Sequence, residues 1–148
     1  MPKQISVSEA HEAMQQGGTY VDVRSTVEFA QGHPAGAVNV PLFEPDEATA
    51  EMQPNPDFMR VMQATFPPDT RLLVGCQAGG RSARAAQMLE RVGFQDVSNV
   101  RGGFGGARDP MSGRVFDPGW AEAGLPVEEG APSGQRYDDL LDAADRQS

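Results

Sequence analysis

The sequence has few of the residues that hold metals or form disulfides. It contains one cysteine and two histidines, so no disulfide can form within the chain and no cluster at zinc-ligand spacing can be assembled. We therefore expect no metal and no other cofactor. This leaves Cys76 as either an inert core residue or a reactive thiol.

Long apolar runs and an excess of positive charge are also missing. No stretch is apolar for long enough to cross a bilayer, and residues 1–4 lack the basic and then apolar pattern of a secretory signal. Twelve Lys and Arg against 21 Asp and Glu give a formal charge of −9, which disfavours nucleic acid and anionic membranes as partners. We expect a cytoplasmic protein that binds neither and that builds any anion-binding site locally.

Short helices and short strands alternate along the chain. Two Ser-x-x-Glu capping boxes, at 6–9 and 25–28, each precede an expected helix. Asn55 and Pro56 are expected to cap and open another helix, and a fourth follows Cys76. Strands are expected in four apolar runs, at 19–23, 37–40, 71–75 and 96–100. This alternation predicts an α/β domain with a mainly parallel sheet.

Two segments depart from this alternation. Residues 44–57 are rich in Pro, Asp and Glu and indicate a surface loop. The chain is polar and acidic from Ala131 onward. We therefore expect one domain over residues 1–130, followed by an acidic C-terminal tail at 131–148 that is mobile or weakly helical.

Cys76 lies at the expected carboxyl end of a strand, which is the edge where parallel sheets bind ligands. Gly79 and Gly80 allow successive N–H groups to turn inward, and the helix that follows adds the positive end of its dipole. Arg81 adds a positive charge, and the Ser82 hydroxyl, expected at the N-cap, can donate to the sulfur or cap the helix. Such surroundings favour a thiolate, whereas an inert core cysteine is usually followed by more strand or helix.

Two signatures resemble the rhodanese homology domain. The first comprises Asp22-Val23-Arg24, Glu28-Phe29 and residues 32–41, and the second is the run 74–82 around Cys76. The resemblance covers about residues 4–128 and is strongest to single-domain thiosulfate sulfurtransferases of the plant senescence-associated type. It implies a three-layer fold with a central five-stranded sheet flanked by helices, and a persulfide-forming Cys76. It also implies that the backbone amides of the loop cradle the outer sulfur, namely those of Gln77, Ala78, Gly79, Gly80, Arg81 and Ser82.

The chain differs from this family in one place. Gly102-Gly103-Phe104 is present, but Trp120 is displaced by an apparent insertion at about 105–118. Arg108 and Arg114 in the insertion could steer anions or only decorate a surface loop, which is the more common outcome.

Three charged or polar residues of the first signature have structural interpretations. We expect Asp22 and Arg24 to fix a loop by pairing and capping, although a part in catalysis is open. His33 is expected to be a turn residue with a satisfied ring, because a thiolate stabilised by amides needs no general base.

The resemblance implies a sulfurtransferase that moves sulfane sulfur from thiosulfate or a similar donor to cyanide or to a small or protein thiol. Because Arg81 is positively charged, we expect it to anchor the sulfonate of the donor. One alternative is a non-turnover sulfur-relay or docking module. A cysteine phosphatase or arsenate reductase is disfavoured, because those sites place five residues between cysteine and arginine, and here four separate Cys76 from Arg81.

Overall fold

Five parallel strands form the central sheet. The computed structural model describes residues 2–147, so Met1 and Ser148, at the ends of the expected domain and tail, lie outside the described residues. The sheet has the order β1-β8-β7-β2-β4, and every neighbouring pair is parallel. Its strands are β1 (Lys3–Ile5), β2 (Thr19–Asp22), β4 (Val38–Asn39), β7 (Arg71–Gly75) and β8 (Asp96–Val100). The predicted α/β fold is confirmed, and β7 lies in the middle of the sheet.

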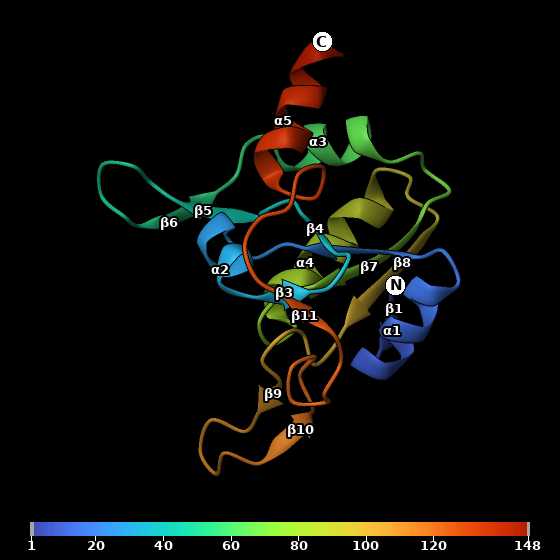
Figure 1. Cartoon of the computed structure of the whole chain (residues 1–148), viewed down its shortest axis with the longest axis vertical. Helices are drawn as coiled ribbons and strands as arrows, with labels where there is room; N and C mark the ends of the chain where they lie inside the picture. The colour runs from blue at the N-terminus through green and yellow to red at the C-terminus, as the bar shows by residue number, and fades with distance from the viewer. Residues whose placement is uncertain (1, 148) are drawn as a thin grey trace.

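Helices cover both faces of the sheet (Figure 1). They are α1 (Val7–Gln15), α2 (Thr26–Gln31), α3 (Phe58–Thr65), α4 (Gly80–Arg91) and α5 (Tyr137–Arg146). Along β7, Leu72 and Val74 pack with α3, α4 and α5, whereas Leu73 packs with α1 and with Phe29 of α2. Side chains of a strand alternate between its two faces, so this alternation divides the core into two halves and gives three layers.

Both predicted capping boxes are present. The Ser6 side chain accepts from the N–H of Glu9 at the start of α1, and the Ser25 side chain accepts from the N–H of Glu28 at the start of α2. The side chain of each glutamate in turn accepts a hydrogen bond from the backbone N–H of its serine. Both helix starts are therefore set by contacts within four residues of chain.

The middle of the chain differs from the sequence prediction in two places. The expected surface loop at 44–57 contains an antiparallel hairpin of β5 (Phe43–Pro45) and β6 (Met52–Pro54). Helix α3 begins at Phe58, after Asp57 rather than after Asn55. Asn55 caps the turn that precedes the helix: its Oδ1 accepts from the N–H of Asp57 at 3.0 Å, while its Nδ2 donates to the carbonyl of Pro41 and to the hydroxyl of Tyr137.

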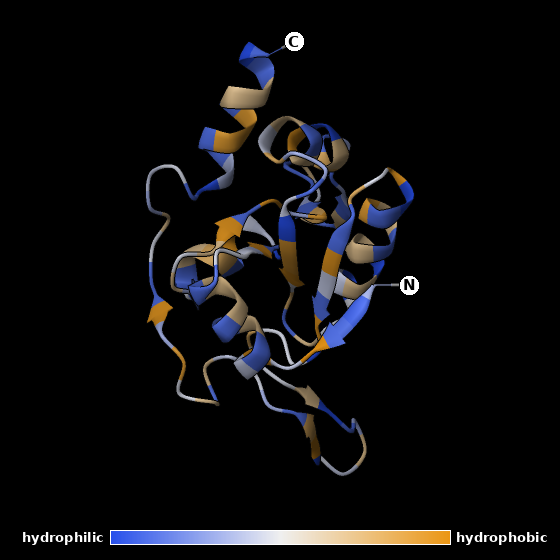
Figure 2. Ribbon diagram, turned by 90° about the vertical axis from the view of Figure 1, so that its right-hand side faces the viewer, coloured by the Kyte–Doolittle hydropathy of each residue, from blue (hydrophilic) through white to orange (hydrophobic). Residues whose placement is uncertain are grey.

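The C-terminal segment is a docked helix, so the expectation of a mobile or weakly helical tail is wrong for Tyr137–Arg146. Hydrophobic and hydrophilic residues alternate along α5 (Figure 2), and Tyr137 and Ala144 are buried in the core beside α3. Arg60 of α3 pairs with Asp145 at 2.8 Å. A few apolar residues on one side of the helix are therefore enough to hold this acidic segment on the domain.

The apparent insertion is a projecting hairpin, composed of β9 (Ala107–Arg108) and β10 (Val115–Asp117) (Figure 1). Its two ends meet, because a Cβ atom on Gly119 would lie 2.3 Å from the nitrogen of Gly106. Trp120 is fully buried and donates from Nε1 to the carbonyl of Pro126. A hairpin with joined ends thus lengthens the chain without removing this tryptophan from the core.

Within residues 2–147, no helix is both long and apolar enough to span a membrane. The same residues contain no group of three or more His, Cys, Asp or Glu side chains that could hold a metal ion.

Candidate active site

Cys76 follows β7 directly, at the carboxyl edge of the sheet. It is 2 % exposed and packs within the core beside α3 and α4. Its sulfur nevertheless has polar neighbours: the N–H of Gly79 donates to Sγ at 3.1 Å, and the Ser82 hydroxyl lies 3.4 Å away. The thiol is therefore shielded from bulk water but has donors that can stabilise a negative charge.

Helix α4 begins closer to the cysteine than the sequence suggests. Gly79 is the N-cap, with a φ of 101° that favours glycine, and Ser82 lies in the first turn, so the expected N-cap role of Ser82 is wrong. The first hydrogen bond of the helix runs from Ala83 to the carbonyl of Gly79. The N–H groups of Gly80, Arg81 and Ser82 have no acceptor within the helix, and they add its positive end to the loop.

The predicted ring of amides is only partly formed around the bare sulfur. In the part of the chain that the structure describes, Gly79 supplies the one backbone N–H that donates to Sγ. Ala78 and Gly80 are exposed and form the outer side of the loop, whereas Gly79 is buried.

The segment 102–105 supports the back of the loop. The N–H of Phe104 donates to the carbonyl of Cys76 at 2.8 Å, and the N–H of Gly105 donates to the carbonyl of Gln77 at 2.9 Å. Gly103 has a φ of 58°, and a Cβ atom there would lie 2.3 Å from the oxygen of Cys76. Sequence reasoning quoted this Gly-Gly-Phe run but gave it no role.

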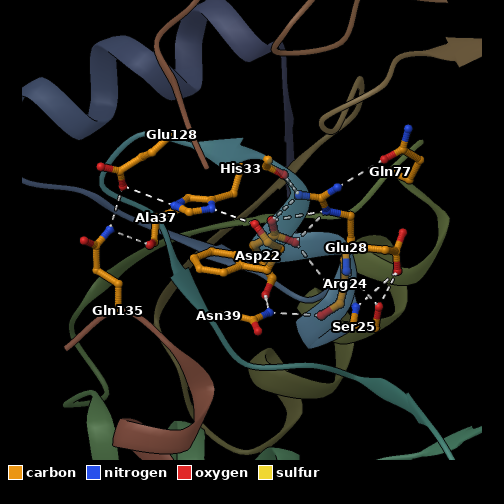
Figure 3. Close-up of polar contacts among 12 residues, drawn as sticks. Asp22, Arg24, Ser25, Glu28, His33, Ala37, Asn39, Gln77, Glu128 and Gln135 are labelled. Atoms are coloured by element: carbon orange, nitrogen blue, oxygen red, sulfur yellow. Dashed lines mark hydrogen bonds and ion pairs between the residues drawn. The ribbon is translucent and has the colours of Figure 1, made fainter. Parts of the chain in front are cut away.

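Arg24 connects the end of β2 to the cysteine loop. Figure 3 shows its guanidinium between Asp22 and Gln77, donating from Nε and Nη2 to the carboxylate and from Nη1 to Oε1 of Gln77 at 3.3 Å. It also donates to the carbonyl of Gly32 at 2.7 Å and lies 4.5 Å from the centre of the Phe104 ring. The predicted structural pairing of Asp22 and Arg24 is confirmed, and the contact to Gln77 extends it to the loop.

Arg81 is paired with Glu28, at 2.9 Å and 3.2 Å between nitrogen and oxygen atoms. Burial disfavours the charged form of Glu28, but hydrogen bonds from Arg81 and Ser25 outweigh it and hold the pKa of Glu28 at about 2, below its ordinary value of 4.5. The same carboxylate raises the pKa of Arg81. The positive charge expected at Arg81 is present, although a carboxylate from α2 already accompanies it.

A polar pocket of about 340 Å³ opens beside these residues. Its lining combines the Arg24 guanidinium, the ionised Glu28 and the ring of Phe104 with two amide side chains, those of Gln31 and Gln77. The pocket is next to the loop that follows Cys76, and it can admit a small polar molecule from the outside.

The other residues considered from the sequence lie away from Cys76 or have structural partners. His33 is buried, stacks on Phe29 and has both ring nitrogens in contact, with the carbonyl of Phe29 at 2.8 Å and with Glu128 at 3.2 Å (Figure 3). This confirms the satisfied ring that was predicted. Arg108 pairs with Glu122 beside the hairpin, and Arg114 is exposed near the hairpin's tip.

Asn99 is the residue near the sulfur that sequence reasoning missed. It is 3 % exposed on β8, its Oδ1 lies 2.6 Å from the hydroxyl of Ser82, and its Nδ2 donates to Oε1 of Gln4 on β1 at 2.9 Å. The signal in the sequence is an asparagine inside an otherwise buried parallel strand, where apolar residues are the norm.

The fold and the site together define an α/β domain that carries a lone cysteine in a glycine-containing loop, between a central parallel strand and a helix N-terminus. The sequence model of the Rhodanese-like domain matches residues 6–108, which is more than half of the chain. The chain belongs to the rhodanese-like domain family.

Two plant proteins and one bacterial structure illustrate the relationship. The chain is 36 % identical over 128 residues to "Thiosulfate sulfurtransferase 16, chloroplastic" of Arabidopsis thaliana, covering 86 % of this chain and 94 % of that protein. It is 33 % identical to "Senescence-associated protein DIN1" of Raphanus sativus, covering 87 % of this chain and 62 % of that protein. The crystal structure of Rv0390 from M. tuberculosis aligns with a TM-score of 0.69 and 24 % identity, over 86 % of this chain and 98 % of that one, and supports the fold.

Proposed function

We propose that this protein is a sulfurtransferase that carries sulfane sulfur as a persulfide on Cys76. The observation that carries the proposal is the position of Sγ, at the carboxyl end of the central strand and 3.1 Å from the N–H of Gly79, at the start of α4. The family is one in which relatives are named thiosulfate sulfurtransferases. The donor is therefore proposed to be thiosulfate or a compound of similar chemistry.

The transfer is proposed to take two steps. In the first, the Cys76 thiolate attacks the outer sulfur of thiosulfate, the sulfur–sulfur bond of the donor breaks, and sulfite leaves with the bonding electron pair. In the second, cyanide or a thiolate attacks the outer sulfur of the persulfide, and the Cys76 thiolate is restored. Small thiols and a thiol on a partner protein are both proposed acceptors, and the cytoplasm is the proposed location.

The loop supplies the binding groups for this scheme. The N–H groups from Gln77 to Ser82 are proposed to hold the outer sulfur, because an anionic sulfur is stabilised by several N–H donors at a helix start. Arg81 is proposed to anchor the sulfonate of the donor. Since Glu28 already pairs with Arg81, the sulfonate would share the guanidinium with this carboxylate.

Intact-mass spectrometry after treatment with thiosulfate tests the proposal. The expected result is the gain of one sulfur, about 32 Da, on the wild type and no gain on Cys76→Ser. Release of the added sulfur by cyanide, with repeated turnover, would support an enzyme. A stable persulfide with negligible cyanide turnover would support a sulfur-relay module, and absence of the added sulfur would overturn the proposal.

The loop is short for a phosphatase or arsenate reductase. Four residues separate Cys76 from Arg81, whereas those enzymes place five residues between the cysteine and the arginine. Turnover of p-nitrophenyl phosphate that is lost in Cys76→Ser would contradict the sulfurtransferase assignment.

A further inference from the structure

A chain of three side chains leads from Cys76 to the edge of the sheet. The Ser82 hydroxyl is fully buried and lies 3.4 Å from Sγ of Cys76. On its other side it lies 2.6 Å from Oδ1 of Asn99, whose Nδ2 donates to Oε1 of Gln4 at 2.9 Å. Gln4 is exposed, so the chain begins at the sulfur and ends at solvent.

Ser82 has a single hydroxyl hydrogen and three candidate acceptors. These are Sγ of Cys76 at 3.4 Å, the carbonyl of Gly79 at 3.2 Å and Oδ1 of Asn99 at 2.6 Å. The shortest contact takes the hydrogen, so Ser82 donates to Asn99 in this arrangement. The lone pairs of the hydroxyl then face the sulfur, which suits a neutral thiol that donates its own hydrogen.

The same heavy-atom positions also permit the opposite direction. The oxygen and nitrogen of an amide group are nearly identical in size, so rotating the Asn99 amide by a half-turn places Nδ2 against Ser82 and Oδ1 against Gln4. Gln4 can turn its own amide in solvent and donate to that oxygen. Ser82 then accepts from Asn99 and its hydrogen is free to point at Sγ, which suits an anionic sulfur.

We propose that Gln4, Asn99 and Ser82 form a reversible hydrogen-bond chain, whose direction follows the charge on the Cys76 sulfur. With a neutral thiol, every hydrogen bond of the chain points away from the sulfur. With a thiolate or a persulfide anion, every hydrogen bond points toward it. Asn99 is therefore a positioning residue, acting through Ser82, and it deepens the sulfurtransferase function proposed above, on which its biological relevance rests.

Other groups near Cys76 have fixed roles in this scheme. Tyr20 and Asp22 approach from β2, with burial raising the pKa of Tyr20 well above its ordinary value of 10.0. Arg24 neutralises Asp22, and Arg81 of α4 pairs with Glu28 of α2. The Gly79 N–H donates to the sulfur in either state. Among the described residues, Ser82 supplies the side-chain hydroxyl within hydrogen-bond distance of Sγ, and a hydroxyl can change from acceptor to donor.

The pH dependence of Cys76 alkylation by iodoacetamide tests the proposal, because this reagent reports the thiolate without requiring sulfur transfer. Asn99→Asp supplies only acceptors and holds the Ser82 hydrogen away from the sulfur. We expect alkylation about 5-fold slower at neutral pH and a midpoint shifted to higher pH. Asn99→Leu removes both donor and acceptor, leaves Ser82 free to turn to the sulfur, and is expected to alkylate nearly as the wild type does.

A double-mutant cycle separates the effect of the hydrogen-bond chain on alkylation from the through-space effect of the new carboxylate. In a Ser82→Ala background the chain is broken, so Asn99→Asp should then slow alkylation much less than it does with Ser82 present. Equal slowing in both backgrounds would overturn the proposal.

Substitutions of the exposed residue Gln4 give a second test that does not disturb the core. Gln4→Glu is expected to slow alkylation and Gln4→Lys to speed it, each by about 2-fold and only when Ser82 is present. No difference between these variants would contradict the chain. If the wild type gains no sulfur from thiosulfate, the proposed function fails by itself, since alkylation is measured without a donor.

Discussion

The cysteine loop (residues 76–82) and the projecting hairpin (residues 107–117) adjoin the same glycine-rich segment. Arginines and glycines lie in or beside both regions, but their surroundings differ. The loop is held by backbone hydrogen bonds from Phe104 and Gly105 and by the buried Arg24. The hairpin projects from the domain and leaves Met111 94 % exposed and Phe116 61 % exposed. We therefore expect replacement of an arginine or a glycine to affect stability or reactivity strongly only where the surrounding structure cannot rearrange.

Two arginine–carboxylate pairs give the largest expected contrast. The side chains of Arg24 and Asp22 are 3 % and 2 % exposed, whereas those of Arg108 and Glu122 are 42 % and 35 % exposed. We expect Arg24→Met to lower the free energy of unfolding by about 3–5 kcal/mol, because it leaves a buried carboxylate unpaired. Arg108→Met should cost about 0–1 kcal/mol. Urea unfolding measures both, and similar costs would contradict the distinction between the two regions.

Two glycines with left-handed backbones give the next contrast. Gly103 has a φ of 58° behind the cysteine loop, and Gly113 has a φ of 74° in the hairpin. Alanine at either position strains the backbone by about 1–2 kcal/mol, but only at Gly103 would the added Cβ meet the Cys76 oxygen. Gly103→Ala should therefore also slow persulfide formation by about 10-fold or more, by displacing the loop. The rate is followed by intact mass, with Gly113→Ala as the matched control.

Strong acid should remove a measurable contribution to stability from the Glu28–Arg81 pair of the loop, and little from the exposed Glu122–Arg108 pair. The pKa of Glu28 in the folded protein is about 2, below its ordinary value of 4.5, so its contribution to stability is fully present above about pH 4.5 and is lost as the pH falls through about 2. The difference in unfolding free energy between wild type and Glu28→Gln should thus shrink toward zero over this range. Glu122→Gln, at the exposed pair, should differ little from wild type throughout. A Glu28→Gln difference that grows in acid would refute the assignment.

The smallest effect is expected from shortening the hairpin. Replacing residues 109–114 by an Asn-Gly turn removes Arg114 and Met111 but preserves the two strands. We expect no change in the rate of persulfide formation from thiosulfate. A slower reaction with thiosulfate, together with unchanged alkylation by neutral iodoacetamide, would instead show that Arg114 steers anions toward the site.

The features that sequence reasoning recovered are those encoded locally. The capping boxes at Ser6 and Ser25 and the short apolar strands each depend on residues within a few positions, and they place Cys76 at the sheet's carboxyl edge. The pairing of Arg81 with Glu28 joins residues 53 positions apart, and the contact of Asn99 with Gln4 joins residues 95 positions apart. A single sequence does not specify which of several polar residues meet at such separations.

The error at the C-terminus has a related cause. Tyr137, Leu140 and Leu141 are apolar, but the acidic composition around them favours the prediction of a tail. These side chains are buried or partly buried by packing against α3, which is far away in the sequence. The sequence alone does not indicate that α3 and α5 pack together. The predicted start of α3 at Pro56 is slightly early, because residues 56–57 form a turn before the helix begins at Phe58.

The docking of α5 also determines how much of the sequence a chimeric protein must contain for the domain to keep a complete core. The part that matches the family ends at residue 108, yet Tyr137 and Ala144 complete the core on the α3 side and the Asn55–Tyr137 hydrogen bond secures the junction. A graft that ended at the family boundary would leave the side chains under α5 facing water, and exposed apolar surface of this kind promotes aggregation. Transplanting this domain into another protein therefore calls for the sequence through Arg146.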